Sequence, residues 1–161
     1  MTRIFLTALL LGGLTYTAGA QNKASLYLGK ASMGKGDQEA AKDEFLSTIN
    51  AAQDEYGAEA KYRLAEIFYN AKDYKQCNET LFSLNNDFAS YTEWVGKSYL
   101  LLADSYLAMG DSYQAKATLR SLIDNFPLEE IKGNASAKLK KIDDEELKKR
   151  PKSDTLSNGK N

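Results

Sequence analysis

The sequence predicts an all-α protein, a solenoid of three helix pairs followed by a capping helix, and three observations lead to this fold class. Apolar residues recur three and four positions apart, as in Tyr99, Leu102 and Tyr106, which is the spacing of one helix face. The same pattern returns around Leu28, Leu64 and Leu102, at intervals of 36 and 38 residues, and such a period is typical of solenoids. An Asp stands nine residues after each of these leucines, where it can begin the second helix of a pair.

The clearest unit covers residues 96–127. Gly110 suits a helix C-terminus, Asp111 can accept a backbone N–H bond as the next N-cap, and Gln114 is placed to act as its capping-box partner. The unit is therefore predicted to be a tight antiparallel helix pair. Its predicted core positions are Tyr99, Leu102, Ala103, Tyr106, Ala115, Leu119, Leu122 and Phe126.

Two copies precede this unit, at about residues 58–95 and 22–57. A shift of 38 residues aligns the second unit without a gap: Leu64, Ala65, Phe68, Asp73, Cys77, Leu81, Leu84 and Phe88. A further shift of 36 residues aligns Leu28, Gly29, Asp37, Ala41 and Phe45, with Ile49 one residue beyond the late apolar slot. Ser32 stands where the other units have an aromatic residue, so the first unit is predicted to be the weakest.

The units are separated by extra residues with local explanations. Ser90, followed three residues later by Glu93, predicts a capping box and a helix that begins near Tyr91. Before the second unit, Gln53 to Gly57 predict a longer loop that ends in a glycine.

Residues 128–149 predict the capping helix. Its apolar positions lie on one face and charges cover the rest, as the outward side of a terminal solenoid element requires. Glu129 at its start and Lys149 near its end complement the helix dipole. Residues 150–161 are polar and basic and are predicted to be disordered.

The first 20 residues predict a secretory signal peptide. Arg3 precedes an apolar run from Ile4 to Leu14, and small residues at 18–20 precede Gln21. The run has 11 residues, whereas a helix that spans a bilayer needs roughly 20. We therefore expect cleavage before Gln21, a helical-repeat domain over residues 21–149, and no integral membrane segment after cleavage.

The aromatic, Leu-Ala, Tyr, Gly-Asp, Ala, large apolar and Pro positions of residues 96–127 resemble the tetratricopeptide repeat (TPR) family. The resemblance implies a right-handed TPR solenoid that acts as a non-catalytic protein-protein interaction scaffold. Residues 57–74 look like secreted bacterial cell-envelope TPR proteins, of the outer-membrane-assembly lipoprotein or Tol-Pal-associated periplasmic type. The expected location is thus periplasmic or outer-membrane-associated. The alternative is a truncated or duplicated end of a larger array that acts structurally through self-association.

The resemblance also implies where a partner binds. In the family the first helix of each pair lines a concave groove, and its repeat positions five, nine and twelve fall on Tyr62, Glu66, Tyr69, Leu100, Asp104 and Leu107. Spacings of four and three place each trio on one stripe of a helix. Such a groove would be aromatic and acidic and would suit a partner with apolar anchors and Lys or Arg. Leu100 and Leu107 could instead pack against neighbouring helices.

The composition argues against other functions. The chain has no histidine, which removes the commonest general base and metal ligand, so we expect neither an enzyme nor a metal or cofactor site. The formal net charge is −1, which gives no electrostatic basis for nucleic acid binding. Cys77 occupies the slot of Ala41 and Ala115 and is predicted to be buried packing rather than a reactive thiol. Four acidic residues at 143–146 lack the spacing of a calcium loop and are predicted to be a solvated helix end.

The expected partner is another envelope protein or an extended peptide. The first helix has Gly29 and Ser32 at packing slots, and no polar capping helix is predicted before it. We therefore expect the first pair to be the least stable unit or to be covered, including through a homo-oligomer formed by this repeat.

Overall fold

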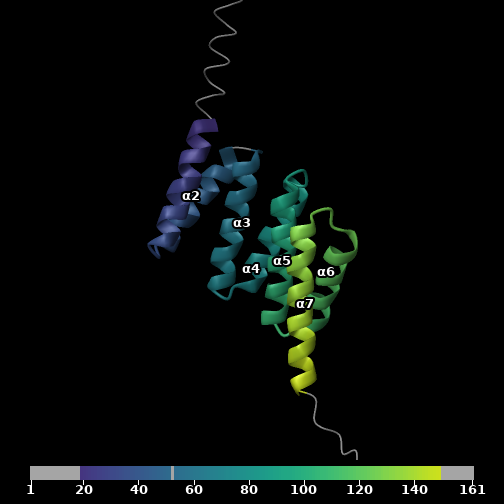
Figure 1. The fold of residues 1–161 in the computed structure, drawn as a ribbon. Coiled ribbons are helices and arrows are strands. Elements are labelled where there is room, and N and C mark those ends of the chain that lie inside the picture. Colours follow the sequence, from purple (N-terminus) through teal and green to yellow (C-terminus); the bar gives the residue numbers. More distant parts are fainter. Residues whose placement is uncertain (1–18, 52, 150–161) are drawn as a thin grey trace, which may run out of the picture.

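The computed structural model describes residues 19–51 and 53–149 (Figure 1). Over these ranges the chain forms seven helical segments joined by short turns, without a strand. Residues 1–18 of the predicted signal peptide and the whole predicted tail, residues 150–161, lie outside the described residues. Among the described helices, none combines the length and the hydrophobicity that crossing a membrane requires.

The helices follow one another in pairs. The first helix is described over residues 19–34 and is followed by α2 (Gln38–Ala51). The second pair is α3 (Glu55–Asn70) with α4 (Tyr74–Asp87), the third is α5 (Thr92–Ala108) with α6 (Ser112–Asn125), and α7 (Glu129–Lys149) closes the described part. The predicted all-α, TPR-like solenoid is confirmed.

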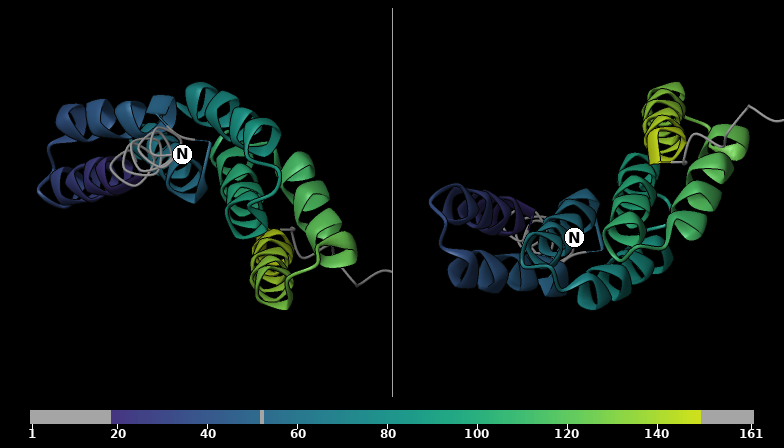
Figure 2. Two further views of the ribbon diagram at one scale, coloured as in Figure 1. Left: turned by 90° about the horizontal axis from the view of Figure 1, so that it is seen from above. Right: turned by 90° about the horizontal axis from the view of Figure 1, so that it is seen from below.

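The helices are arranged along an arc. Each helix from α2 to α7 packs against its neighbours in the sequence, and α3 also contacts α5 as α5 contacts α7. Seen along the helix axes, the first helix, α3, α5 and α7 lie on the inner side of the arc and α2, α4 and α6 on the outer side (Figure 2). The concave surface is therefore built by the first helix of each pair and by α7.

The three turns inside the pairs have the same geometry, which confirms the repeat. The Asp37, Asp73 and Asp111 carboxylates each accept a backbone N–H bond from the residue three positions on, at 3.2, 3.1 and 2.9 Å. The preceding residue is left-handed in each turn, with φ of 80°, 62° and 84° at Gly36, Lys72 and Gly110 respectively. The Asp111 N–H itself donates to the Tyr106 carbonyl at 2.8 Å, so it needs no capping-box bond from Gln114.

The predicted helix start near Tyr91 is confirmed, because α5 begins at Thr92 with Tyr91 as N-cap. Two other local predictions are wrong. α5 has no side-chain cap bond, so the box predicted from Ser90 and Glu93 is not formed. The Tyr91 N–H instead donates to the Phe88 carbonyl at 3.0 Å, because the chain turns tightly after α4. The loop predicted to end at Gly57 ends earlier, since α3 begins at Glu55 and the Asp54 carboxylate caps the Gly57 N–H at 3.0 Å.

The core follows the repeat slots. Ala41, Cys77 and Ala115 are all fully buried, as predicted for a slot where two helices approach closely. In the first unit the late slot is filled by Thr48, which is fully buried and donates its hydroxyl to the Glu44 carbonyl at 2.9 Å. The internal bond explains why a polar residue can stand where an apolar one is expected.

Gly29 allows the first helix to approach α2. A Cβ at this position would lie 2.5 Å from Cε1 of the fully buried Phe45 ring, so the ring or the helix would have to move. We expect Gly29→Ala to lower the free energy of unfolding by about 1–3 kcal/mol, as overpacking in a core does. Thermal or urea unfolding measures this change.

The control is Gly133→Ala in α7, where no atom lies within 4 Å of the added Cβ. This variant should gain about 0.5–1 kcal/mol, because alanine is the better helix former. Equal effects of the two substitutions would contradict the close approach at Gly29.

Candidate functional site

The concave surface between α3 and α5 brings together four of the six residues predicted to line a groove. Tyr62, Glu66, Tyr69 and Asp104 are all partly exposed there, and the Asp104 charge acts on both tyrosines. Leu100 is only 8% exposed and belongs to the core of the third unit, so the packing alternative holds for it.

Leu107 lies near Asp104, on the side of the surface that faces α7. It is 39% exposed and lines a small pocket of about 140 Å³ together with Asp104, Lys138 and Ile142. Leu107 therefore keeps a surface position, but beside α7 rather than beside α3.

The aromatic part of the site is centred on Tyr62 and Trp94. Their ring centroids are 5.6 Å apart, and Trp94 is only 7% exposed, so Tyr62 lies on an aromatic floor supplied by α5. Burial raises the pKa of Tyr62, and the negative charges of Glu66 and Asp104 raise it further. The Tyr62 hydroxyl thus stays protonated at neutral pH and remains a hydrogen-bond donor.

Tyr69 lies about two helical turns further along α3. It packs edge-on against Tyr74, with ring centroids 5.6 Å apart. Burial raises the pKa of Tyr69, and the Asp104 charge adds to the shift. The two tyrosines on α3 therefore present an aromatic stripe of partly exposed rings with protonated hydroxyls.

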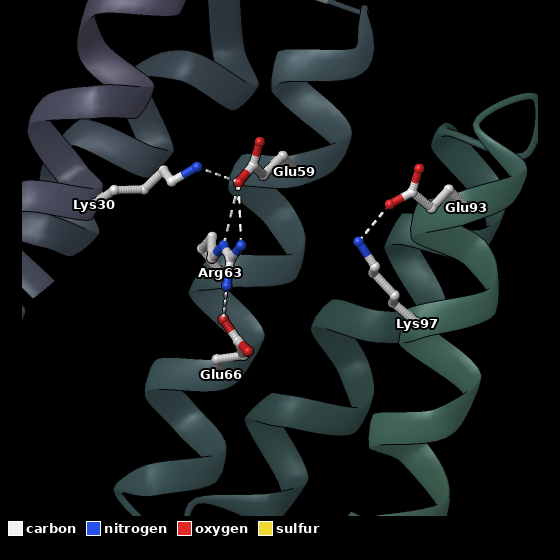
Figure 3. A network of polar contacts seen from close by, with 6 residues as sticks. All are labelled: Lys30, Glu59, Arg63, Glu66, Glu93 and Lys97. Carbon is white, nitrogen blue, oxygen red and sulfur yellow. Dashed lines mark hydrogen bonds and ion pairs between the residues drawn. The ribbon is translucent and has the colours of Figure 1, made fainter. Parts of the chain in front are cut away.

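Ion pairs cover the upper part of the surface (Figure 3). Lys30 Nζ of the first helix lies 2.7 Å from Glu59 Oε1, and the same carboxylate is 3.2 Å from the Arg63 guanidinium. Arg63 also pairs with Glu66 at 2.9 Å. Burial alone would lower the pKa of Arg63. The negative charges and hydrogen bonds of Glu66 and Glu59 have the larger combined effect, so the pKa of Arg63 is raised. The network joins the first helix to α3.

Two cations lie over the aromatic floor. Lys97 Nζ is 4.2 Å from the Trp94 ring centroid, and the Arg63 guanidinium carbon is 5.9 Å from it. Lys97 also pairs with Glu93 at 2.5 Å on the same helix. Both cations are partly exposed, with 34% and 29% of their side-chain surface accessible to a ligand.

The surface is not acidic, which corrects the electrostatic expectation from the sequence. Glu66 is paired with Arg63, and Lys138 Nζ of α7 lies 2.7 and 2.8 Å from the two Asp104 oxygens. The two predicted carboxylates are therefore neutralised by cations of the chain itself.

Sequence reasoning missed the three cations Arg63, Lys97 and Lys138. Arg63 directly follows Tyr62, and a look at both neighbours of each groove position would have found it. Lys138 is on α7, which has no aligned repeat, so no family offset points to it.

Two of the four acidic residues at 143–146 serve a structural purpose. Lys116 Nζ on α6 lies 3.1 Å from Asp143 and 2.6 Å from Glu146, which ties α7 to α6. Within residues 19–51 and 53–149 there is no group of three or more His, Cys, Asp or Glu that could hold a metal ion.

Comparison with known families adds one finding. Residues 97–128, which hold most of α5, all of α6 and Pro127, match the sequence profile of the tetratricopeptide repeat. This match supports the TPR family. A search of curated proteins found no match to the chain. TPR repeats generally mediate protein-protein interactions, and the helical solenoid described above agrees with that role.

Proposed function

We propose that this protein is a non-catalytic scaffold of the bacterial cell envelope that binds a partner protein or an extended peptide on its concave surface. The observation that carries the proposal is the surface between α3 and α5, where partly exposed tyrosines lie beside cations held over a buried Trp94. Aromatic and arginine side chains on a rigid support are typical of the residues that dominate binding energy at protein interfaces.

The chemistry of the surface suits a partner that has both apolar and polar or charged groups. Tyr62 and Tyr69 offer aromatic area and hydroxyl donors, and Lys97 and Arg63 offer charge to carboxylates or carbonyl oxygens. Because each cation already has a carboxylate partner, a ligand would exchange one ion pair for another rather than meet a free charge. Such exchange favours orientation and specificity over raw affinity.

Export is part of the proposal. The apolar run and the small residues before Gln21 support a signal peptide that is cleaved there, and a periplasmic or outer-membrane-associated location for the mature chain. Intact-mass measurement of the native protein tests this step. A chain that retains Met1 and fractionates with the cytoplasm would contradict it.

The binding surface is tested with Tyr69→Ala and Asp104→Ala in the mature protein. The amount of partner captured from an envelope extract should fall by about tenfold or more for Tyr69→Ala if this residue is one of the few that dominate the interface. Tyr62→Ala is expected to reduce capture as well, but it also removes packing on Trp94, so Tyr62→Phe is included to isolate the hydroxyl.

The matched control is Tyr113→Ala on α6, a tyrosine that is 80% exposed and lies on a helix of the outer side of the arc. This variant should capture as much partner as the wild-type protein does. Thermal midpoints are measured for all variants. Unchanged capture, or capture lost only in proportion to lost stability, would show that the concave surface is not the binding site.

A further inference from the structure

At one repeat position the first helix exposes a leucine, whereas the second and third units bury the equivalent leucine. We call this position the open slot of the first helix. Leu28, Leu64 and Leu102 share one repeat position, yet Leu64 and Leu102 are 7% and 1% exposed whereas Leu28 is 55% exposed. In the second unit this leucine packs in one cluster with Ala41 and Phe45 of the preceding α2. In the third unit it packs in one cluster with Cys77 and Leu81 of the preceding α4.

These two clusters define the kind of element that covers the slot. Both covering helices present a small buried residue, Ala41 or Cys77, and a large apolar residue four positions later, Phe45 or Leu81. Residues four apart lie on the same face of a helix. The element that fits over Leu28 is therefore an amphipathic helix with a small and a large apolar residue at this spacing.

The open slot is part of a larger apolar stripe. Ala24, Tyr27, Leu28 and Ala31 stand at positions i, i+3, i+4 and i+7 of the first helix, which is the spacing of one helix face, and all four are exposed. We call these four residues the N-terminal patch. The first helix stands at one end of the arc, so a further helix can pack against it without displacing α2 or α3 (Figure 1).

The charge around the N-terminal patch selects the partner. Residues 19–36 contain Lys23, Lys30 and Lys35 and neither Asp nor Glu. Lys23 Nζ and Lys30 Nζ lie 6.0 and 5.4 Å from the Tyr27 ring centroid, so cations flank the patch. Lys30 is already paired with Glu59 at 2.7 Å, so Lys23 and Lys35 supply the charge that a partner would meet. A complementary helix carries carboxylates beside its apolar stripe. A second copy of the same helix would bring two basic surfaces together, which disfavours symmetric self-pairing.

We propose that the N-terminal patch binds an amphipathic, acidic helix of another protein, which packs on Leu28 as α2 packs on Leu64. This surface is separate from the one between α3 and α5, so the proposal stands independently of binding there. The partner helix extends the solenoid by one element and covers the unit that the sequence predicts to be the weakest.

The chain supplies a probe of the required chemistry. A synthetic peptide with the sequence of residues 37–51 contains α2, with Ala41 and Phe45 four apart and four acidic residues, Asp37, Glu39, Asp43 and Glu44. Its binding to the full-length and the mature protein is measured by fluorescence anisotropy. We expect saturable binding that Leu28→Lys weakens at least about tenfold, because the Leu28 side chain loses its buried contact.

Two controls distinguish specific binding at the N-terminal patch from nonspecific hydrophobic binding. Leu46→Lys removes another leucine that is 44% exposed, on α2, and should leave binding unchanged. A peptide with Glu39→Gln, Asp43→Asn and Glu44→Gln should bind several-fold more weakly and with less dependence on salt. Saturable binding with both responses supports the proposal.

Other results would overturn it. No saturable binding to the wild-type protein, or equal weakening by Leu28→Lys and Leu46→Lys, would show that the patch does not take this helix. A solution mass that reveals a stable oligomer, lost in Leu28→Lys, would show that a second copy occupies the patch instead.

Discussion

Phe45→Ala is expected to lower the free energy of unfolding by about 3–5 kcal/mol, the cost of removing a large aromatic side chain from a core. Phe45 is fully buried and lies in one cluster with Leu26 of the first helix and with Leu64 and Ile67 of α3. Its ring also lies directly against Gly29. The substitution therefore weakens contacts among three helices at once, and a domain of this size has only about 5–15 kcal/mol of stability in total.

The loss should be local as well as large. Each unit of a solenoid contacts only its neighbours, so damage in the first unit leaves the interfaces of the third intact. Hydrogen exchange of Phe45→Ala should show residues 22–52 opening at much lower free energy than in the wild type, while residues 96–126 keep their protection.

The control is Leu46→Ala, which changes the next residue along α2. Leu46 is 44% exposed, so its replacement should change stability by no more than about 0.5 kcal/mol. Equal loss of protection across all units in Phe45→Ala would show that the described helices unfold as one cooperative block, against the expectation of a weak first unit.

The fold could be predicted because its signals are local and repeated. The turn residues at Asp37, Asp73 and Asp111 predict where each second helix begins, and the carboxylate does cap the helix in all three. The cap of α5 could not be predicted in this way, although the helix does begin next to Tyr91 as expected. Tyr91 caps no backbone N–H with its side chain, and the helix begins where a tight turn after Phe88 directs the chain.

The candidate site was predictable only in part. Helical spacing places Tyr62, Glu66 and Tyr69 on one stripe, and this depends on the sequence of a single helix. The charge of the surface depends on which helices meet, and the pair between Asp104 and Lys138 joins residues on α5 and α7. Likewise, burial of Leu100 at 8% exposure results from packing of α6 and α7 on α5, which spacing alone does not reveal.

The exposed Leu28 gives a related example. Its slot predicts burial, because the equivalent leucines are covered by the preceding pair. The position within the array, and not the residue, decides its exposure. Aligned repeat slots therefore predict core residues in the second and third units better than in the first.

Alkaline pH is expected to destabilise the protein through Cys77. Burial raises the pKa of its thiol to about 12, although the neighbouring Ser105 hydroxyl opposes the shift. In the unfolded chain the thiol loses its proton near pH 8.5. Between about pH 9 and 12 the unfolded state therefore binds fewer protons than the native state, and by linkage the free energy of unfolding falls as pH rises. Below pH 8 the thiol is protonated in both states, so the stability contributed by the raised pKa of Cys77 is fully present.

The measurement is the urea midpoint of the wild type and of Cys77→Ala at pH 8, 9, 10 and 11. Alanine occupies the same fully buried slot in the other two units, at Ala41 and Ala115, so the variant should keep the fold. Above pH 9 the wild type should lose up to about 1.4 kcal/mol per pH unit more than the variant, which has no thiol to titrate. Tyr62, whose pKa is also raised by burial, adds a further loss above pH 10 that Tyr62→Phe removes. Parallel curves for wild type and Cys77→Ala would mean that the thiol is accessible to water in the native state and is not the buried packing residue described here.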